Sequence, residues 1–433
     1  MGLLRERAMQ HYLNLPARRW RNSATIAGIL VLCCLGACTV PDHHAPDGNA
    51  ALTSAEPAQQ PDAAVTPRPS SNAAGAIVGS LLGKLLGGKS TAGSAVGALS
   101  GGKIDGALGV TVYYATDREF RPRENSYGWQ PNRKAPHLSY GSVLVSIPEK
   151  RAPGELPLAP WYDFISSDDA QQYVLIEGMQ RWSRADFFAT IKNINATAPD
   201  RRAAFIYIHG YSNTFDDAAR RTAQMAVDLD IGALPVFYSW PSKGTLAGYE
   251  FDQNSTQWTQ THLQDFLADF AEQSLVTDIY IIAHSMGNRP LTLALAGLLE
   301  TRPQLRPLFK QVVLAAPDIN ADVFREQIAP RFASLKLPTT LYASANDKAI
   351  RASYGFAEWD RIGDIRGPVV AIPGMELVDA STVVMNFMGH DYFASNRVLL
   401  TDIATMIKTG QRAGKRGGLR GVPARAPQYW AFP

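Results

Sequence analysis

One short stretch constrains this chain more than any other, the pentapeptide Ala283-His284-Ser285-Met286-Gly287. An apolar run at 279–282 precedes it, and a stretch with the spacing of a buried helix follows at 291–299. A strand, a sharp turn and a helix with a serine at the apex form a nucleophile elbow, which pushes the hydroxyl above a sheet. Only a small residue fits where strand and helix pass, and Ala283 meets that need. The pattern predicts acyl transfer through Ser285; the alternative is a serine in an ordinary turn.

A serine nucleophile needs a base, and in elbows of this kind the acid and then the histidine follow the serine along the chain. The chain has 8 histidines, and of these only His390 follows Ser285. It lies in a glycine-bearing loop at 388–392, after a predicted strand at 376–379. We therefore predict that His390 is the general base; the alternative is a loop histidine that caps the next helix.

Two aspartates compete to orient this base. Asp347 follows a predicted strand at 339–343, and Asp318 ends the strand before it. A carboxylate behind the imidazole fixes its tautomer and stabilises the imidazolium. We predict Asp347 as the acid because it follows the later strand, and Asp318 stays the alternative acid. The one that does not serve would form a salt bridge or a cap.

The oxyanion hole requires two backbone donors. One is the N–H of Met286, directly after the serine. A buried strand is predicted at 204–208, and His209-Gly210-Tyr211 follows it. Because Gly210 lets the chain turn, the N–H of Tyr211 is predicted to face the serine as the second donor.

These residues resemble the α/β-hydrolase superfamily, most closely an esterase- or lipase-like branch of bacterial proteins of unknown function. The resemblance implies an eight-stranded, mostly parallel sheet flanked by helices, with Ser285, His390 and Asp347 at the triad positions. It covers residues 110–407 and rests on five motifs: His209-Gly210-Tyr211-Ser212-Asn213-Thr214-Phe215, Tyr238-Ser239-Trp240-Pro241-Ser242, the elbow at 283–287, Ala315-Ala316-Pro317-Asp318 and Gly389-His390-Asp391-Tyr392-Phe393.

An independent count of strands agrees with that fold class. Branched and apolar runs of this length suit strands that helices cover on both faces, which is typical of an α/β protein. The predicted strands are 110–114, 142–147, 204–208, 236–239, 278–283, 312–315, 339–343 and 376–379.

Substrate contacts are expected from loops at the carboxyl ends of these strands. The segment 238–258 begins at such an end and is rich in aromatic residues. Trp240 lies nearest the strand and is predicted to line the substrate pocket. The alternative places it in the core beneath the loop.

The N-terminal residues 1–37 resemble a bacterial lipoprotein signal peptide. Arginines precede a short apolar run, and Leu35-Gly36-Ala37-Cys38 follows it. The resemblance implies cleavage before Cys38 and lipidation of its thiol; the alternative is a short uncleaved membrane anchor. We therefore expect a membrane-anchored lipoprotein of the bacterial cell envelope, facing the periplasm or the exterior. All 3 cysteines lie in this region, which excludes a disulfide or a cysteine nucleophile in the folded body.

Two segments separate the signal from the hydrolase domain at 110–407, and one follows it. Residues 38–74 are rich in Pro and Ala and are predicted to be a disordered tether. Residues 75–109 are Gly-rich and are predicted to be a spacer or a membrane-associated segment. Within them, 83–90 matches the phosphate-binding pattern G-x-x-x-x-G-K-[ST], which we interpret as a coincidence in a low-complexity repeat. The tail at 408–433 is basic and predicted to be disordered.

The sequence therefore predicts an exported, membrane-tethered serine hydrolase that cleaves small-molecule or lipid esters. No cofactor or metal is expected, because the histidines are scattered and no H-E-x-x-H pattern occurs. Nucleic acid is not an expected partner, and nothing in the sequence fixes an oligomeric state. The alternative is a non-catalytic envelope lipoprotein that uses the hydrolase scaffold for binding or assembly.

Overall fold

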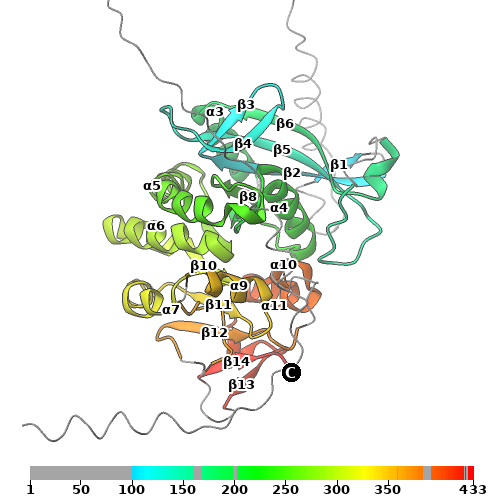
Figure 1. The fold of residues 1–433 in the computed structure, drawn as a ribbon. Coiled ribbons are helices and arrows are strands. Elements are labelled where there is room, and N and C mark those ends of the chain that lie inside the picture. The colour runs from blue at the N-terminus through cyan, green and yellow to red at the C-terminus, as the bar shows by residue number, and fades with distance from the viewer. Residues whose placement is uncertain are drawn as a thin grey trace, which may run out of the picture. The chain divides into compact units, whose positions relative to one another are not determined.

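A twelve-stranded sheet forms the centre of the described structure (Figure 1). The computed structural model describes residues 100–433, except residues 105, 160–166, 198–201, 358, 368, 370, 384–391, 424, 426 and 427. The strands of the sheet are β1 (Ser100–Ile104), β2 (Ala107–Thr116), β5 (Ser139–Ile147), β6 (Leu175–Trp182), β7 (Ala203–Ile208), β8 (Leu234–Ser239), β9 (Asp278–His284), β10 (Phe309–Ala315), β11 (Thr339–Ala343), β12 (Met375–Asp379), β13 (Arg420–Val422) and β14 (Tyr429–Ala431).

The strands are ordered β13-β14-β12-β11-β10-β9-β7-β8-β2-β5-β6, with β1 paired to β2. From β14 to β2 every neighbouring pair is parallel. Strands β5 and β6 extend one edge in antiparallel register, and β13 extends the other. Each of the eight strands predicted from the sequence forms, so the mostly parallel α/β sheet is confirmed.

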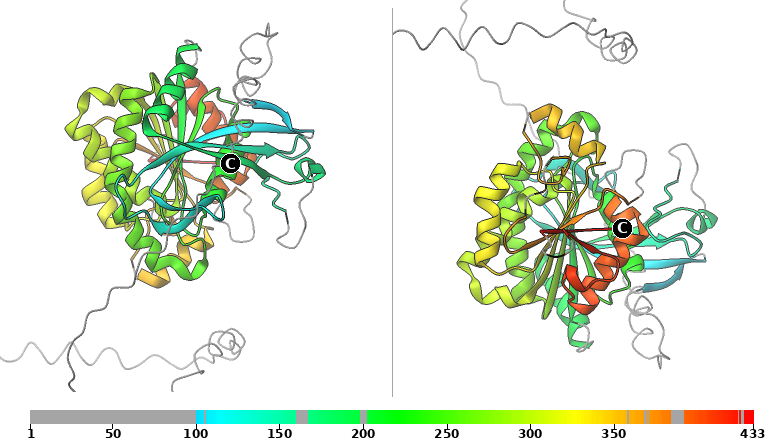
Figure 2. Two further views of the ribbon diagram at one scale, coloured as in Figure 1. Left: turned by 90° about the horizontal axis from the view of Figure 1, so that it is seen from above. Right: turned by 90° about the horizontal axis from the view of Figure 1, so that it is seen from below.

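Helices cover both faces of this sheet (Figure 2). One apolar cluster joins α3, α5, α6 and α8 to alternate strand residues such as Ile206 and Ile208, and a second joins α4 and α11 to Phe205 and Tyr207. The period of two along a strand explains this division. The helices are α3 (Arg184–Thr197), α4 (Phe215–Leu229), α5 (Tyr249–Gln273), α6 (Asn288–Thr301), α7 (Ala321–Val323), α8 (Ala329–Ser334), α9 (Lys348–Ala357), α10 (Tyr392–Ser395) and α11 (Arg397–Thr409).

A small hairpin, β3 (Arg118–Arg121) and β4 (Ser126–Pro131), follows β2. Because β2 is parallel to β8 and β7, its last residues reach the same edge of the sheet as theirs. The hairpin therefore begins at the edge where the loops after the parallel strands lie. Arg118, its first residue, is 1% exposed.

The described part of the C-terminal tail is ordered, which corrects the prediction that 408–433 is disordered. Strand β14 adds to the sheet beside β12. Arg416 is buried, with its Nε 2.9 Å from Asp402 Oδ1 and its Nη1 3.4 Å from Glu376 Oε2. A buried guanidinium needs such carboxylates, and they lie 14 and 40 residues away in sequence, so the basic composition of the tail alone was misleading.

The boundary of the Gly-rich segment also shifts. Residues 100–104 and 107–109, predicted to belong to a spacer, form β1 and the start of β2, which pair in antiparallel register. Gly102 and Gly106 have positive φ angles of 87° and 83°, a conformation that glycine adopts without strain. The predicted signal peptide, the tether and Cys38 lie outside the described residues, as does the phosphate-binding pattern at 83–90.

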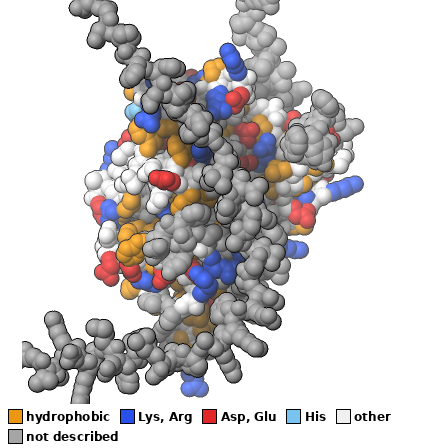
Figure 3. All heavy atoms as spheres, in the orientation of Figure 1, with side chains coloured by type: hydrophobic (Ala, Val, Ile, Leu, Met, Phe, Trp, Pro, Cys, Tyr) orange, Lys and Arg blue, Asp and Glu red, His pale blue; other side chains and the backbone are white. Residues whose placement is uncertain are grey.

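Charges of both signs are interspersed on the face of the molecule seen in Figure 3. Within the described ranges, no helix combines the length and the apolar character needed to cross a membrane.

Candidate active site

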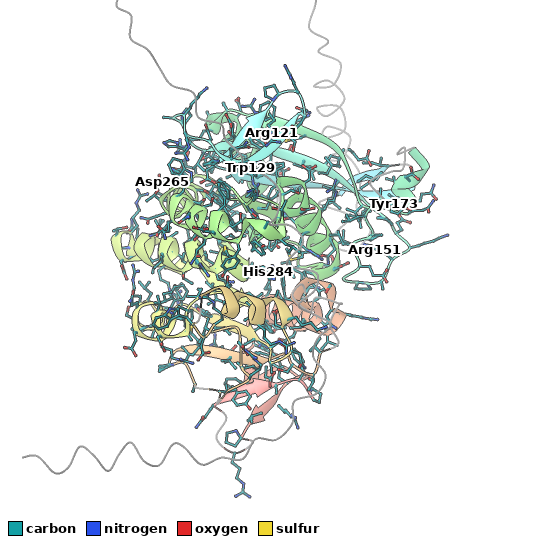
Figure 4. All side chains as sticks on the ribbon, in the orientation of Figure 1. Arg121, Trp129, Arg151, Tyr173, Asp265 and His284 are labelled. Atoms are coloured by element: carbon teal, nitrogen blue, oxygen red, sulfur yellow. The ribbon has the colours of Figure 1, made fainter. Side chains whose placement is uncertain are left out.

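The predicted elbow forms at the carboxyl end of β9. The strand ends at His284, labelled in Figure 4, and a single 3-10 turn, Ser285–Gly287, leads into α6. Ser285 has a φ of 51°, in the left-handed region that non-glycine residues rarely adopt. Such a residue costs about 1–3 kcal/mol and persists only where its surroundings enforce it, often at a functional site. The strand, turn and helix predicted here are confirmed.

Two glycines allow the chain to pass close to this serine. A Cβ atom on Gly210 would lie 2.8 Å from both Ser285 Cβ and His284 Nδ1. A Cβ atom on Gly287 would overlap the His209 carbonyl oxygen, because the two atoms would be closer than the sum of their van der Waals radii. The loop after β7 is therefore packed directly against the elbow, and side chains at these two positions would push it away. Ala283 is fully buried on β9.

Two backbone N–H groups are available at this contact. Among the described residues, neither Met286 nor Tyr211 donates its backbone N–H to a hydrogen-bond acceptor. Both residues adjoin the closely packed pair formed by Ser285 and Gly210. A pair of such N–H groups beside a serine is the arrangement that stabilises an oxyanion.

Asp347 lies just beyond the end of β11 and is 1% exposed. Its Oδ1 accepts the backbone N–H groups of Ala349 at 3.0 Å and Ile350 at 2.9 Å. The carboxylate therefore caps the N-terminus of α9, which fixes its position. The loop that holds Asp347 is joined to the end of β12, because Asn346 Nδ2 donates to the Ser381 carbonyl at 2.8 Å.

Asp318, the alternative acid, is placed beside the elbow by its backbone. Its N–H donates to the Ser285 carbonyl at 3.2 Å. Its carboxylate is shared between two guanidinium groups, with Arg361 Nε 3.0 Å from Oδ1 and Arg289 Nη2 3.1 Å from Oδ2. Tyr249 and Ser353 also donate hydroxyl hydrogen bonds to it, at 2.9 and 3.0 Å.

These partners decide the ionisation of Asp318. Burial by itself would raise the pKa of the carboxyl group, but the charges of Arg289 and Arg361 and the two hydroxyl donors hold the pKa below its ordinary value. Asp318 is thus a fixed anion whose role in the described structure is to pair with two arginines.

His390 lies outside the described residues, but both flanks of its loop are described. On the far side, Phe393 is 1% exposed and its ring stacks on the imidazole of His284, with centroids 4.6 Å apart. On the near side, Val383 N–H donates to the Ala380 carbonyl at the end of β12. The far flank of the loop is therefore anchored next to the elbow.

Trp240 does not line an open pocket, which corrects the prediction made for it. The side chain is fully buried, stacks on His209 with centroids 4.8 Å apart, and donates its indole N–H to the His209 carbonyl at 2.7 Å. The residue supports the loop after β7 from within the core, which is the alternative that the sequence left open.

Arg118 carries no motif that would single it out in the sequence, yet it contacts three of the loops at this edge. Its guanidinium donates to Ser239 Oγ at 2.8 Å, to the Gly128, Ser242 and Asn213 carbonyls at 3.2, 3.0 and 2.8 Å, and lies 3.2 Å from His209 Nε2. These partners come from β4, from the loop after β8 and from the loop after β7, so only the folded chain brings them together.

Comparison with known proteins shows that the sequence matches one family and that the fold is similar to several solved structures. Residues 187–409 match the family described as "Alpha/beta hydrolase of unknown function (DUF900)". No curated protein matches the sequence.

Three solved structures that are similar to this chain are described by their sequence identity, their coverage and their TM-score. A predicted CIB-like hydrolase from Thermoplasma acidophilum is 14% identical, with 48% of this chain and 87% of that chain covered and a TM-score of 0.26. Est1E from Butyrivibrio proteoclasticus is 12% identical, with coverages of 62% and 92% and a TM-score of 0.28. EstE1, a thermostable carboxylesterase cloned from a metagenomic library, is 13% identical, with coverages of 63% and 85% and a TM-score of 0.25.

Proposed function

Since the chain belongs to the family of α/β hydrolases of unknown function that it matches over residues 187–409, we propose that it cleaves carboxylic esters through Ser285. His390 is the proposed general base and Asp347 the proposed orienting acid. The backbone N–H groups of Met286 and Tyr211 are the proposed oxyanion donors.

The proposed reaction has two halves. Ser285 Oγ attacks the ester carbonyl carbon while His390 takes the hydroxyl proton, and the negative charge on the carbonyl oxygen is held by the two N–H groups. The C–O bond to the alcohol then breaks, and the alcohol leaves with the proton from His390. Water, deprotonated by His390, next attacks the acyl carbon. The bond to Ser285 Oγ then breaks, His390 returns the proton to that oxygen, and the acid is released.

One observation carries this proposal, the left-handed Ser285 packed against Gly210 between two backbone N–H groups that have no acceptor among the described residues. A serine in an ordinary turn needs none of these features. Strain, close approach and free donors together are typical of a site that stabilises a tetrahedral intermediate.

The assignment of His390 rests on chain connectivity. Phe393 stacks on His284, and three residues of chain span at most about 11 Å. This contact supports the proposal that His390 reaches the elbow. On the acid side, Asp347 is buried and is held in place by the backbone N–H groups of α9, whereas the carboxylate of Asp318 is shared by two arginines.

The proposed enzyme acts at a membrane. Cleavage before Cys38 and lipidation of its thiol would tether the hydrolase domain in the bacterial envelope, so that small-molecule or lipid esters are its proposed substrates. Replacing Cys38 by Ser is expected to move the protein from the membrane fraction to the soluble fraction while its esterase activity is retained. A variant that stays in the membrane would contradict the lipid anchor.

An active-site-directed fluorophosphonate tests the chemistry. Covalent labelling of the wild type at Ser285, and no labelling of Ser285→Ala at an unchanged melting temperature, is the expected result. A folded wild type that is not labelled would favour the non-catalytic scaffold. A series of p-nitrophenyl esters of increasing acyl length then reports the preferred substrate.

A further inference from the structure

The buried guanidinium of Arg118 lies under the loop that provides the proposed Tyr211 donor. Its Nη2 is 3.2 Å from His209 Nε2, and Ser239 Oγ lies 3.3 Å from the same nitrogen. A guanidinium group only donates hydrogen bonds. The Nε2 atom of His209 must therefore accept in this arrangement, and the hydroxyl of Ser239 can donate to it as well.

The other ring nitrogen must then carry the proton. Burial, and next the charge of Arg118, hold the pKa of His209 well below its ordinary value, so the ring is neutral and has one N–H. His209 Nδ1 lies 2.8 Å from the carbonyl oxygen of Gly210, which can only accept. The ring therefore donates from Nδ1 to Gly210.

A second tautomer competes with this one. The Trp240 carbonyl oxygen lies 3.1 Å from His209 Nε2 and would accept from it if that nitrogen carried the proton. In that state the lone pair of Nδ1 would face the Gly210 carbonyl and repel it. The presence of a permanent donor at Nε2 is what favours the Nδ1–H tautomer.

The Gly210 carbonyl and the Tyr211 N–H belong to one peptide group. In a planar trans peptide these two bonds point in opposite directions. With its oxygen held against the His209 ring, the peptide turns its N–H away from that ring. Gly210 also packs against Ser285, because a Cβ atom there would lie 2.8 Å from Ser285 Cβ.

We infer that Arg118 is a positioning residue: by donating to Nε2 it selects the tautomer of His209, which holds the Gly210 carbonyl and so orients the Tyr211 N–H as an oxyanion donor. The link from Arg118 to the peptide stands on the hydrogen bonds of a neutral His209 ring and needs no assumption about catalysis. Only the last step, the use of the N–H, rests on the proposed function.

Nuclear magnetic resonance of the full chain labelled with ¹⁵N-histidine tests the link directly. Long-range ¹H–¹⁵N correlations distinguish the two tautomers, and the His209 signals are identified by their loss in His209→Asn. We expect Nδ1–H in the wild type and Nε2–H in Arg118→Met. Nε2–H in the wild type, or Nδ1–H in both proteins, would overturn the inference. The wild-type measurement does not depend on the folding of Arg118→Met.

A matched pair of variants at His209 tests the consequence for catalysis. The side-chain amide of Asn reaches the Nδ1 position and donates to Gly210, whereas the amide of Gln reaches the Nε2 position. With p-nitrophenyl acetate, kcat is expected to stay within about tenfold of the wild type in His209→Asn, and to fall about 10²–10³-fold in His209→Gln with KM little changed, the loss typical of one oxyanion donor. Equal losses at equal melting temperatures would contradict the inference.

Arg121→Met is the control for the hairpin. Arg121 also lies on β3, but its side chain is 34% exposed and pairs with Glu124, so kcat should not change. The two proposals fail in different ways. A wild type that fluorophosphonate does not label removes the proposed esterase, while the tautomer measurement still tests the role of Arg118.

Discussion

The ring of Phe393 stacks on the imidazole of His284, with a centroid distance of 4.6 Å and an angle of 29° between the planes. His284 is the residue before the proposed nucleophile, and Phe393 follows the proposed base by three positions. One aromatic contact thus joins the two segments that the proposed mechanism brings together.

Truncating the Phe393 side chain should affect catalysis as well as stability. We expect Phe393→Leu to lower kcat about tenfold with KM unchanged, because the loop that holds His390 loses its anchor, and to destabilise the fold by about 1–3 kcal/mol through the cavity. Phe332→Leu is a matched control, since Phe332 is also 1% exposed but packs on the other face of the sheet. Equal activities of the two variants would contradict this role for Phe393.

The substitution Asp347→Asn separates the helix-capping role of Asp347 from its proposed role in catalysis. Asn caps a helix about as well as Asp, so Asp347→Asn should keep its hydrogen bonds to Ala349 and Ile350 and its melting temperature. If Asp347 orients the base, kcat is expected to fall by about 10⁴. Esterase assays with thermal unfolding check both parts, and a variant that retains its activity would exclude Asp347 as the acid.

Replacing Asp318 by Asn should lower stability strongly and activity only a little, the opposite of what is expected for Asp347→Asn. Asp318→Asn leaves the buried Arg361 and the partly buried Arg289 without their carboxylate, which is expected to cost about 3–5 kcal/mol of unfolding free energy. Activity per folded molecule should fall far less than in Asp347→Asn. Urea unfolding combined with active-site titration distinguishes the two aspartates.

The lowered pKa of Asp318 also predicts a pH dependence of stability. A carboxyl group whose pKa is lower in the folded state stabilises that state at neutral pH, and this contribution is lost as the pH falls through the folded-state pKa. The unfolding free energy of the wild type should therefore drop more steeply in acid than that of Asp318→Asn. Parallel pH profiles would contradict the lowered pKa.

A methyl group at Gly287 tests the close packing at the elbow. Gly287→Ala would place its Cβ against the His209 carbonyl oxygen, a backbone atom that cannot rotate away. We expect a loss of about 1–3 kcal/mol and of most activity. Gly178→Ala on β6 is the control, because its Cβ would meet no heavy atom within 4 Å, and surface changes of this kind stay within about 0.5 kcal/mol.

The two arginines near Glu376 provide a further matched pair. Arg416 is buried between Glu376 and Asp402, so Arg416→Met is expected to cost about 3–5 kcal/mol. The side chain of Arg412 also contacts Glu376 but is 50% exposed, and pairs of that kind contribute about 0–1 kcal/mol. Similar stabilities of Arg416→Met and Arg412→Met, measured by urea unfolding, would refute the burial of this tail.

The sequence predicted those features that depend on local pattern. The elbow at Ser285 has a strand before it, a helix after it and small residues around it, and all of these lie within about twenty residues. The eight strands are equally local, because a strand covered on both faces is a run of apolar residues. His390 was predicted as the base from chain order alone, and its position relative to Ser285 stays a prediction.

What the sequence did not predict depends on contacts between distant segments. Arg416 lies in a glycine-rich basic stretch, and only the carboxylates of Asp402 and Glu376 make its burial favourable. Trp240 is a core residue because the His209 ring and carbonyl meet it across two strands. Arg118 has partners in three segments, so no spacing along the chain reveals it.

The position of β2 has a consequence for the family-defining stretch, residues 187–409. Strand β2 pairs with β8, and helix α4 packs on residues of β2 and β5. A fragment cut at 187 and 409 would therefore leave β8 as a bare sheet edge and uncover the apolar side of α4, a combination that favours aggregation. The matched stretch therefore depends on β2 to complete its sheet, and the strand that closes this edge also leads directly to Arg118.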